Sequence, residues 1–129
     1  MTVDLRNTDE TLLCEAEAQM LQFVTKLARQ EGVQIDSRVL ARFAPVSFDA
    51  ALVGAIEDTA RKRGHSVMRL PSGAGHDAQM FAPNCPTAMV FVPSIDGVSH
   101  NVRERTEPRH IAAGAQVLAD VTLKLASGG

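Results

Sequence analysis

The sequence predicts an α/β fold, and three observations support this. Some segments alternate apolar and polar residues or form a short continuous apolar run, as strands do. Others carry apolar residues at the spacing of one helix face. The two kinds follow one another along the chain in the order β-α-β, then α-β-loop-β-loop-α, which is typical of a layered α/β arrangement. The two halves meet near 44–48, where Pro45 interrupts the pattern.

Residues 1–46 are expected to form a β-α-β unit. The predicted elements are a strand at 2–6, a helix at 8–31 and a strand at 33–43. Asn7 and Glu10 have the spacing of a capping box, which predicts the start of the helix. Gly32 suits the residue that follows a helix C-terminus. An isolated terminal strand needs neighbours to pair with, so the strand at 2–6 calls for a partner.

Residues 47–129 are expected to form a second α/β unit. The predicted elements are a helix that opens at Ser47 or Phe48-Asp49 and ends at Gly64, a strand at 65–70, a strand at 86–93, a loop at 94–107 and a helix from Pro108. The apolar run at 86–93 lies between prolines and is typical of a strand buried on both faces. Pro108 suits the first position of a helix.

Composition excludes several classes of protein. The chain has 129 residues, 45% of them hydrophobic, and a formal net charge of -2, which suits one ordinary globular domain without a nucleic-acid partner. No apolar run reaches the roughly 18 residues of a membrane helix, and the N-terminus lacks a signal-peptide pattern. Cys14 and Cys85 stand far apart without a CxxC motif. We therefore expect a cytoplasmic protein with no membrane partner.

Two loops carry the residues that suggest chemistry. Ser72–Asp77 contains two glycines and a His-Asp pair directly after a predicted strand, where ligand sites collect in open α/β sheets. Ser94–His100 follows the next predicted strand, so the two loops could lie side by side. Glycine pairs are also typical of ordinary turns, and a single histidine in a loop is typical of a solvated surface. The loops could therefore form a ligand site or be ordinary surface loops. The sequence contains no HxD, HExxH or GxSxG motif. The candidate metal ligands are His76, His100, Asp77, Asp96 and Glu104.

Three segments together resemble the C-terminal part of the M20-type metallo-amidohydrolases. They are LPSGAGHDAQMFA at 70–82, MVFVPSIDGVSHNVRE at 89–104 and GAQVLADVTLKLA at 114–126. The most similar group contains N-carbamoyl-L-amino-acid hydrolases, β-ureidopropionases and allantoate amidohydrolases. The resemblance extends to TVDLRN at 2–7 and to FDAALVGAIEDTARKRG at 48–64. It implies that 1–46 is the second half of a lid and dimerisation domain. It also implies that 47–129 is the C-terminal part of a zinc-peptidase-like catalytic domain.

The resemblance implies substrate-binding roles for five residues. Arg6 matches the arginine that binds the substrate carboxylate, a task that suits the planar fork of a guanidinium. A glycine-rich loop that closes on the substrate is matched by Gly73, Ala74 and Gly75. His76 lies in the same motif and is expected to hydrogen-bond near the site.

On the metal side, the resemblance implies that His100 is the C-terminal metal ligand and that Glu104 orients it. Val102 departs from the proline that this group often has. The other metal ligands, the general-base glutamate and a lid asparagine of such enzymes have no counterpart in the sequence. We therefore expect a C-terminal fragment that is inactive alone and binds no metal by itself.

For the full-length enzyme, the resemblance implies a divalent metal (zinc, manganese or nickel), a small N-carbamoyl or ureido substrate, and a homodimer. Two alternatives stay open: a non-catalytic binding or oligomerisation module derived from such an enzyme, and a stand-alone metal-binding domain.

Overall fold

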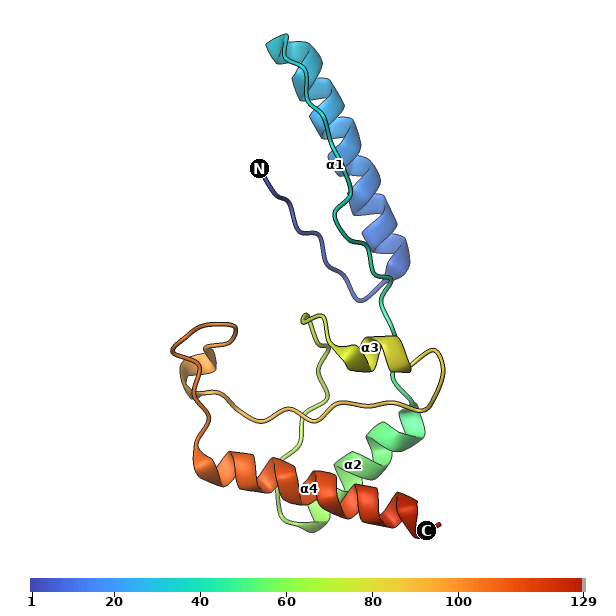
Figure 1. The fold of residues 1–129 in the computed structure, drawn as a ribbon, viewed down its shortest axis with the longest axis vertical. Helices are drawn as coiled ribbons and strands as arrows, with labels where there is room; N and C mark the ends of the chain where they lie inside the picture. Colours follow the sequence, from blue (N-terminus) through green and yellow to red (C-terminus); the bar gives the residue numbers. More distant parts are fainter. Residues whose placement is uncertain (129) are drawn as a thin grey trace. The chain divides into compact units, whose positions relative to one another are not determined.

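The computed structural model describes residues 1–128, in which the regular structure is helical (Figure 1). The helices are α1 (Glu10–Glu31), α2 (Ala50–Lys62), α3 (Asp77–Phe81), the single 3-10 turn η1 (Ile95–Gly97) and α4 (Pro108–Ala126). The chain forms two compact units. Unit 1 contains Met1–Ser47 and Pro71–Gly75, and unit 2 contains Phe48–Leu70 and His76–Gly129. That residues 1–46 are the second half of a lid domain and residues 47–129 the C-terminal part of a catalytic domain stays a prediction.

The N-cap of the long helix α1 of unit 1 lies two residues later than predicted. Asp9 is the N-cap, because its Oδ1 accepts a hydrogen bond from the Leu12 N–H at 3.1 Å. The Asn7 side chain instead accepts from the Asp9 N–H at 2.9 Å, which forms the turn that leads into the helix. The predicted end is confirmed: Gly32 has a φ of 64°, and its N–H donates to the Ala28 carbonyl.

An arginine holds the extended segment 33–43 against α1. Arg42 donates from Nη2 to Glu10 at 2.6 Å and from Nε to Glu17 at 3.1 Å. The two carboxylates lie on one side of α1, seven positions apart in the sequence, which is two helical turns. Figure 1 shows this segment running back along the helix.

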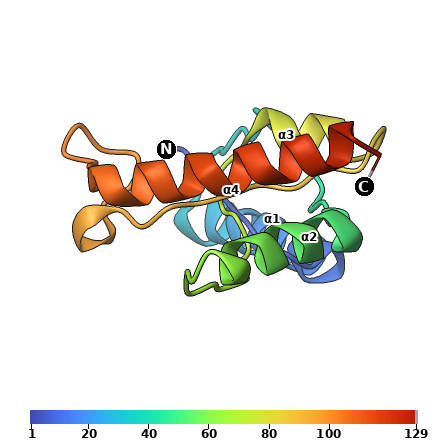
Figure 2. The same ribbon diagram turned by 90° about the horizontal axis from the view of Figure 1, so that it is seen from below.

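In unit 2, α2 and α4 pack against each other (Figure 2). Asp49 caps α2 by accepting from the Leu52 N–H at 2.7 Å, within the start that the sequence predicts. The apolar side chains of Val117 and Val121, one turn apart on α4, are buried. After α2, Arg63 forms a bidentate pair with Asp120 of α4 at 2.6 and 2.9 Å.

The predicted strands are not formed, so the β part of the predicted α/β fold is wrong for residues 1–128. The segments 2–6, 33–43, 65–70 and 86–93 have no strand assignment in the described chain. A strand exists through a ladder of hydrogen bonds to a neighbour about 4.8 Å away. These segments lack such a ladder; an isolated backbone bond, Asp49 N–H to the Thr87 carbonyl at 3.0 Å, is the kind of contact they make.

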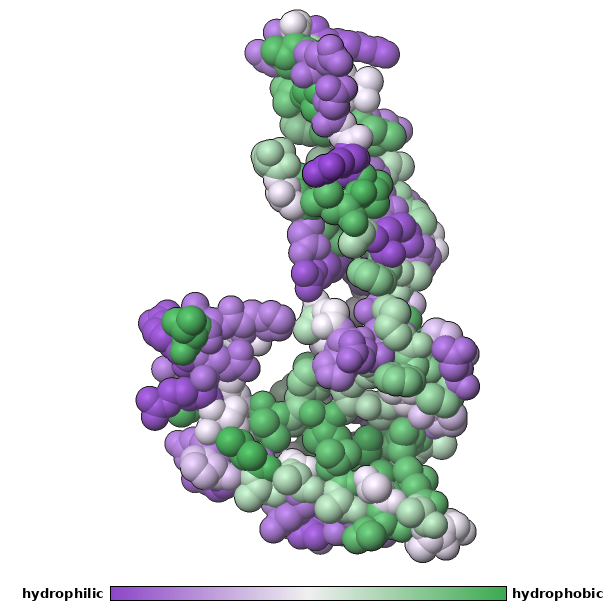
Figure 3. Space-filling view, viewed as in Figure 1, coloured by the Kyte–Doolittle hydropathy of each residue, from purple (hydrophilic) through white to green (hydrophobic). Residues whose placement is uncertain are grey.

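The chain exposes much more surface than its mass predicts. Its accessible area is 10349 Å², whereas a folded monomer of 13.8 kDa exposes about 6,600 Å². Two separate globules that share this mass would still expose only about 8,000 Å². In Figure 3, apolar side chains form much of the visible face of unit 2. None of the helices within residues 1–128 has the length and apolar character needed to cross a membrane.

Candidate functional site

The structure brings together two of the predicted substrate-binding residues in unit 1. Arg6 donates from Nη1 to the carbonyl oxygen of Gly73, which lies 67 positions away in the sequence. This contact joins the N-terminal extended segment to the glycine-rich loop. A guanidinium and a glycine loop therefore share one edge of unit 1.

The same guanidinium also binds Asp4. Its Nε donates to both carboxylate oxygens, at 3.1 and 3.0 Å, and its Nη2 donates to Oδ2 at 2.6 Å. Hydrogen bonding by Arg6 lowers the pKa of Asp4 below its usual value, and the same bond raises the pKa of Arg6. The pair is exposed to solvent on both sides. Asp4 was not among the site residues predicted from the sequence, although residues two apart on an extended segment point to the same side.

The glycine loop is shaped by a serine and leaves open space at its glycines. Ser72 Oγ accepts a hydrogen bond from the Ala74 N–H at 3.2 Å, which forms a local turn. Neither Gly73 nor Gly75 has a left-handed backbone. A Cβ at either position would meet nothing within 4 Å. Both glycines thus border open space in the direction that a side chain would take.

His76, in unit 2, caps the short helix α3. Its Nδ1 accepts a hydrogen bond from the Ala78 N–H at 3.0 Å, and Ala78 itself is buried. A backbone N–H can only donate, so Nδ1 carries no proton in this arrangement. The neutral imidazole therefore bears its proton on Nε2, and this N–H remains available as a donor to another group.

His100 stands in a strained loop that Glu104 stabilises. Its φ is 53°, a left-handed conformation that costs a residue with a Cβ about 1–2 kcal/mol. The His100 N–H donates to Glu104 Oε2 at 2.8 Å, so the carboxylate holds the backbone and leaves the imidazole free. Further back, the Ile95 N–H donates to the Arg105 carbonyl at 2.7 Å and closes the loop. Glu104 was expected to orient His100, and the contact between them is made by the His100 main-chain N–H.

The predicted residues do not assemble a complete metal centre in the described chain. No three histidine, cysteine, aspartate or glutamate side chains gather within residues 1–128. The loop between η1 and α4 lies near the N-terminal end of α4, away from α3, in both ribbon views (Figures 1 and 2). Protein sites for catalytic zinc use three side-chain ligands. The imidazole of His100 could supply one of these three ligands. The described residues therefore do not form a complete catalytic zinc site.

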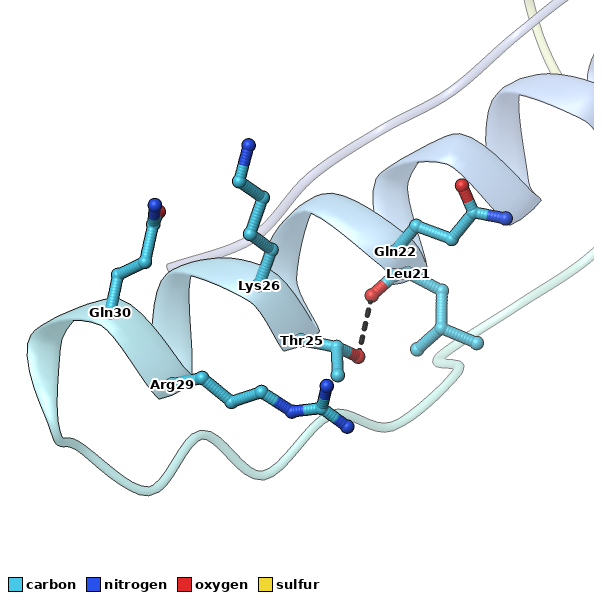
Figure 4. A pocket seen from close by; sticks show the side chains of 6 residues that line it. All are labelled: Leu21, Gln22, Thr25, Lys26, Arg29 and Gln30. Carbon is cyan, nitrogen blue, oxygen red and sulfur yellow. Dashed lines mark hydrogen bonds between the residues drawn. The ribbon is translucent and has the colours of Figure 1, made fainter.

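A shallow hollow on α1 contains none of the predicted site residues (Figure 4). It is lined by Leu21, Gln22, Thr25, Lys26, Arg29 and Gln30. All six side chains come from one helix, and the Thr25 hydroxyl donates to the Leu21 carbonyl of the same helix at 2.8 Å. A single helix face cannot enclose a small molecule, so the hollow does not form a site.

Comparison with known proteins gives one consistent family. Residues 31–124 match the peptidase family M20/M25/M40. The chain is 35% identical over 125 residues to an allantoate amidohydrolase of Escherichia coli (strain K12), which covers 97% of this chain and 30% of that protein. It is 38% identical over 125 residues to an N-carbamoyl-L-amino-acid amidohydrolase of Rhizobium meliloti, again covering 97% of the chain and 30% of the relative.

A solved structure supports the same family. The crystal structure of an amidase of the hydantoinase/carbamoylase family from Burkholderia vietnamiensis superposes with a TM-score of 0.86 at 39% identity. The match covers 92% of this chain and 29% of that one. The chain thus spans about 30% of the length of the relatives it matches. On these grounds the chain belongs to peptidase family M20/M25/M40.

Proposed function

We propose that the chain supplies the substrate-carboxylate site and one metal ligand of an amidohydrolase that cleaves linear amide C–N bonds. The substrate would be an N-carbamoyl amino acid, a ureido acid or an allantoate-type compound. The observation that carries this proposal is the Arg6–Gly73 contact, which joins a carboxylate-binding side chain to an open glycine loop. The names of the similar relatives favour the same class of substrate.

Each residue has a definite task in this proposal. Arg6 holds the substrate carboxylate, and the N–H groups and open faces of Gly73, Ala74 and Gly75 accommodate the substrate beside it. His76 donates from Nε2 to a polar atom of the substrate, since its Nδ1 is occupied by the cap. Glu104 fixes the backbone of His100 so that the imidazole is presented from a rigid loop.

A divalent metal bound at a complete site of such an enzyme would act as a Lewis acid, and His100 is the ligand that this chain would contribute. The choice of zinc, manganese or nickel stays open, because sites of histidine and carboxylate accept several divalent ions. Residues 1–128 offer one ligand in His100 and no cluster of three. We therefore expect the 129-residue chain alone to be catalytically incompetent.

The test is a binding and activity assay on the purified chain. With N-carbamoyl-L-alanine and Zn²⁺, Mn²⁺ or Ni²⁺, we expect binding without hydrolysis. The uncharged amide of the same compound should bind more weakly, and Arg6→Gln should abolish the difference between acid and amide. Arg38→Gln removes the same charge from another extended segment of unit 1 and serves as the control. Metal-dependent hydrolysis by the chain would contradict the expectation that it is inactive alone. If Arg6→Gln still binds the acid more tightly than the amide, Arg6 does not bind the substrate carboxylate.

A genomic observation tests the fragment expectation. An in-frame extension that precedes the codon of Met1 and encodes an HxD segment and a Glu-Glu pair would show a longer natural protein with the remaining metal ligands. A stop codon in that frame would contradict it.

The exposed area favours a second candidate function, a binding or oligomerisation module. The surface of 10349 Å² exceeds that of a folded monomer by about 3,700 Å², and permanent protein interfaces bury about 1,000–2,500 Å² on each partner. The predicted homodimer would use such a surface. Light scattering tests this: a concentration-dependent dimer supports the module, and a clean monomer at high concentration contradicts it.

A further inference from the structure

The guanidinium of the proposed carboxylate-binding arginine already pairs with a carboxylate of this chain. Asp4 takes the Nε–Nη2 edge of Arg6 through bonds of 3.1, 3.0 and 2.6 Å. We propose that Asp4 is an internal counter-ligand of Arg6, which a substrate carboxylate must displace in order to bind. This inference rests on the proposed function, because it concerns the same guanidinium.

The geometry leaves little of the guanidinium for a second carboxylate. A bidentate pair uses two parallel N–H groups on one edge of the fork. Asp4 occupies the Nε–Nη2 edge, and Nη1 already donates to the Gly73 carbonyl. A carboxylate that approached the remaining edge without displacing Asp4 would meet a like charge at close range. Displacement relieves this repulsion and opens the edge that Asp4 holds.

The pair is suited to exchange. Asp4 and Arg6 are two positions apart on an extended segment, so their side chains meet without help from the rest of the fold. Their side chains are 62% and 61% exposed, and exposed ion pairs are only weakly held. A carboxylate that also contacts the glycine loop can therefore compete with Asp4. While no substrate is present, Asp4 thus keeps the Arg6 side chain oriented and balances its positive charge.

Two consequences can be measured. Removing the charge of Asp4 should tighten binding of a carboxylate ligand by on the order of four-fold, the Coulomb term between unit charges about 5 Å apart in water. Displacement should also free the Asp4 carboxyl from Arg6. Its pKa, which hydrogen bonding by Arg6 lowers, should then rise toward its usual value.

The experiment is an NMR titration of the 129-residue chain with N-carbamoyl-L-alanine, which follows the Arg6 Nε–H signal and the Asp4 carboxyl carbon. Asp4→Asn is the test variant. Asp36→Asn is the matched control, since Asp36 is an exposed aspartate of an extended segment in unit 1 that accepts from Gln34 at 3.2 Å. We expect tighter binding with Asp4→Asn, no change with Asp36→Asn, and a raised pKa of Asp4 at saturating ligand.

The possible outcomes separate this inference from the proposed function. Binding that Arg6→Gln abolishes but Asp4→Asn leaves unchanged or weakens overturns the counter-ligand and keeps the role of Arg6. Binding that persists in Arg6→Gln overturns both. A ligand that binds only the Asp4→Asn variant supports the counter-ligand, whereas one that binds neither this variant nor the wild type overturns it. Unaltered circular dichroism shows that the helices are intact in each variant.

Discussion

Gly114, in the middle of α4, tests how closely the segment 86–93 packs on that helix. A Cβ built at Gly114 would lie 2.6 Å from Cγ1 of Val92, which is closer than real side chains approach. At Gly54, within α2, a Cβ would meet nothing within 4 Å. The same substitution by alanine should therefore have different effects at two helical positions of one unit.

The magnitudes follow from two opposing effects. Replacing glycine by alanine inside a helix stabilises it by about 0.5–1 kcal/mol, because alanine loses less backbone entropy on folding. Forcing an extra methyl into a packed site costs about 1–3 kcal/mol. Val92 is 37% exposed and can rotate partly into solvent, which places the cost at the lower end. We expect Gly54→Ala to stabilise unit 2 by about 0.5–1 kcal/mol and Gly114→Ala to destabilise it by up to about 1 kcal/mol.

Urea unfolding followed by far-ultraviolet circular dichroism measures both changes in the free energy of unfolding. The double variant Val92→Ala/Gly114→Ala removes the clashing methyl and should recover the helix gain of α4 relative to Val92→Ala alone. If Gly114→Ala stabilises the chain as much as Gly54→Ala, then Val92 does not pack on α4 and the reasoning is refuted.

Three further predictions concern charged side chains. The Arg63 hydrogen bond lowers the pKa of Asp120, so the contribution of this pair to stability is present at neutral pH and is lost as pH falls below about 3.9 through the folded-state pKa; Asp120→Asn should flatten this part of a stability–pH curve. Glu104→Ala removes the acceptor of the His100 N–H, so hydrogen exchange of that amide with solvent should accelerate. Unchanged slow exchange would contradict the protection of this amide by Glu104. Arg42→Gln should release the segment 33–43 from α1, and limited proteolysis should then cut within it sooner than in the wild type.

The helices were largely predictable because their signals are local. Pro108 begins α4, Gly32 ends α1, and Asp49 caps α2 within the predicted start. Each signal acts within a few residues along the chain, as the hydrogen bonds of a helix do. The cap of α1 was misplaced from Asp9 to Asn7, because two neighbouring polar residues can both accept a backbone N–H.

The strands were predicted from the alternation of apolar and polar side chains, which is only one requirement of a strand. The other requirement is a neighbouring strand that exchanges backbone hydrogen bonds with it along its length. Among residues 1–128 the segment 86–93, with its apolar run, finds no such neighbour, and the extended segments stay unpaired. A pattern of side chains cannot report whether that neighbour is present.

By itself, the sequence determined the helices and the resemblance that the family comparison confirmed, and it singled out Arg6 and the glycine loop. Only the tertiary structure decided that Arg6 reaches Gly73 across 67 positions, that Asp4 occupies the same guanidinium, and that the His100 backbone is clamped. The physical reason is distance along the chain and choice of partner. Helix hydrogen bonds join residues four apart. The contacts that build a site depend instead on which segments the folded chain brings together and on which of several polar groups forms the hydrogen bond.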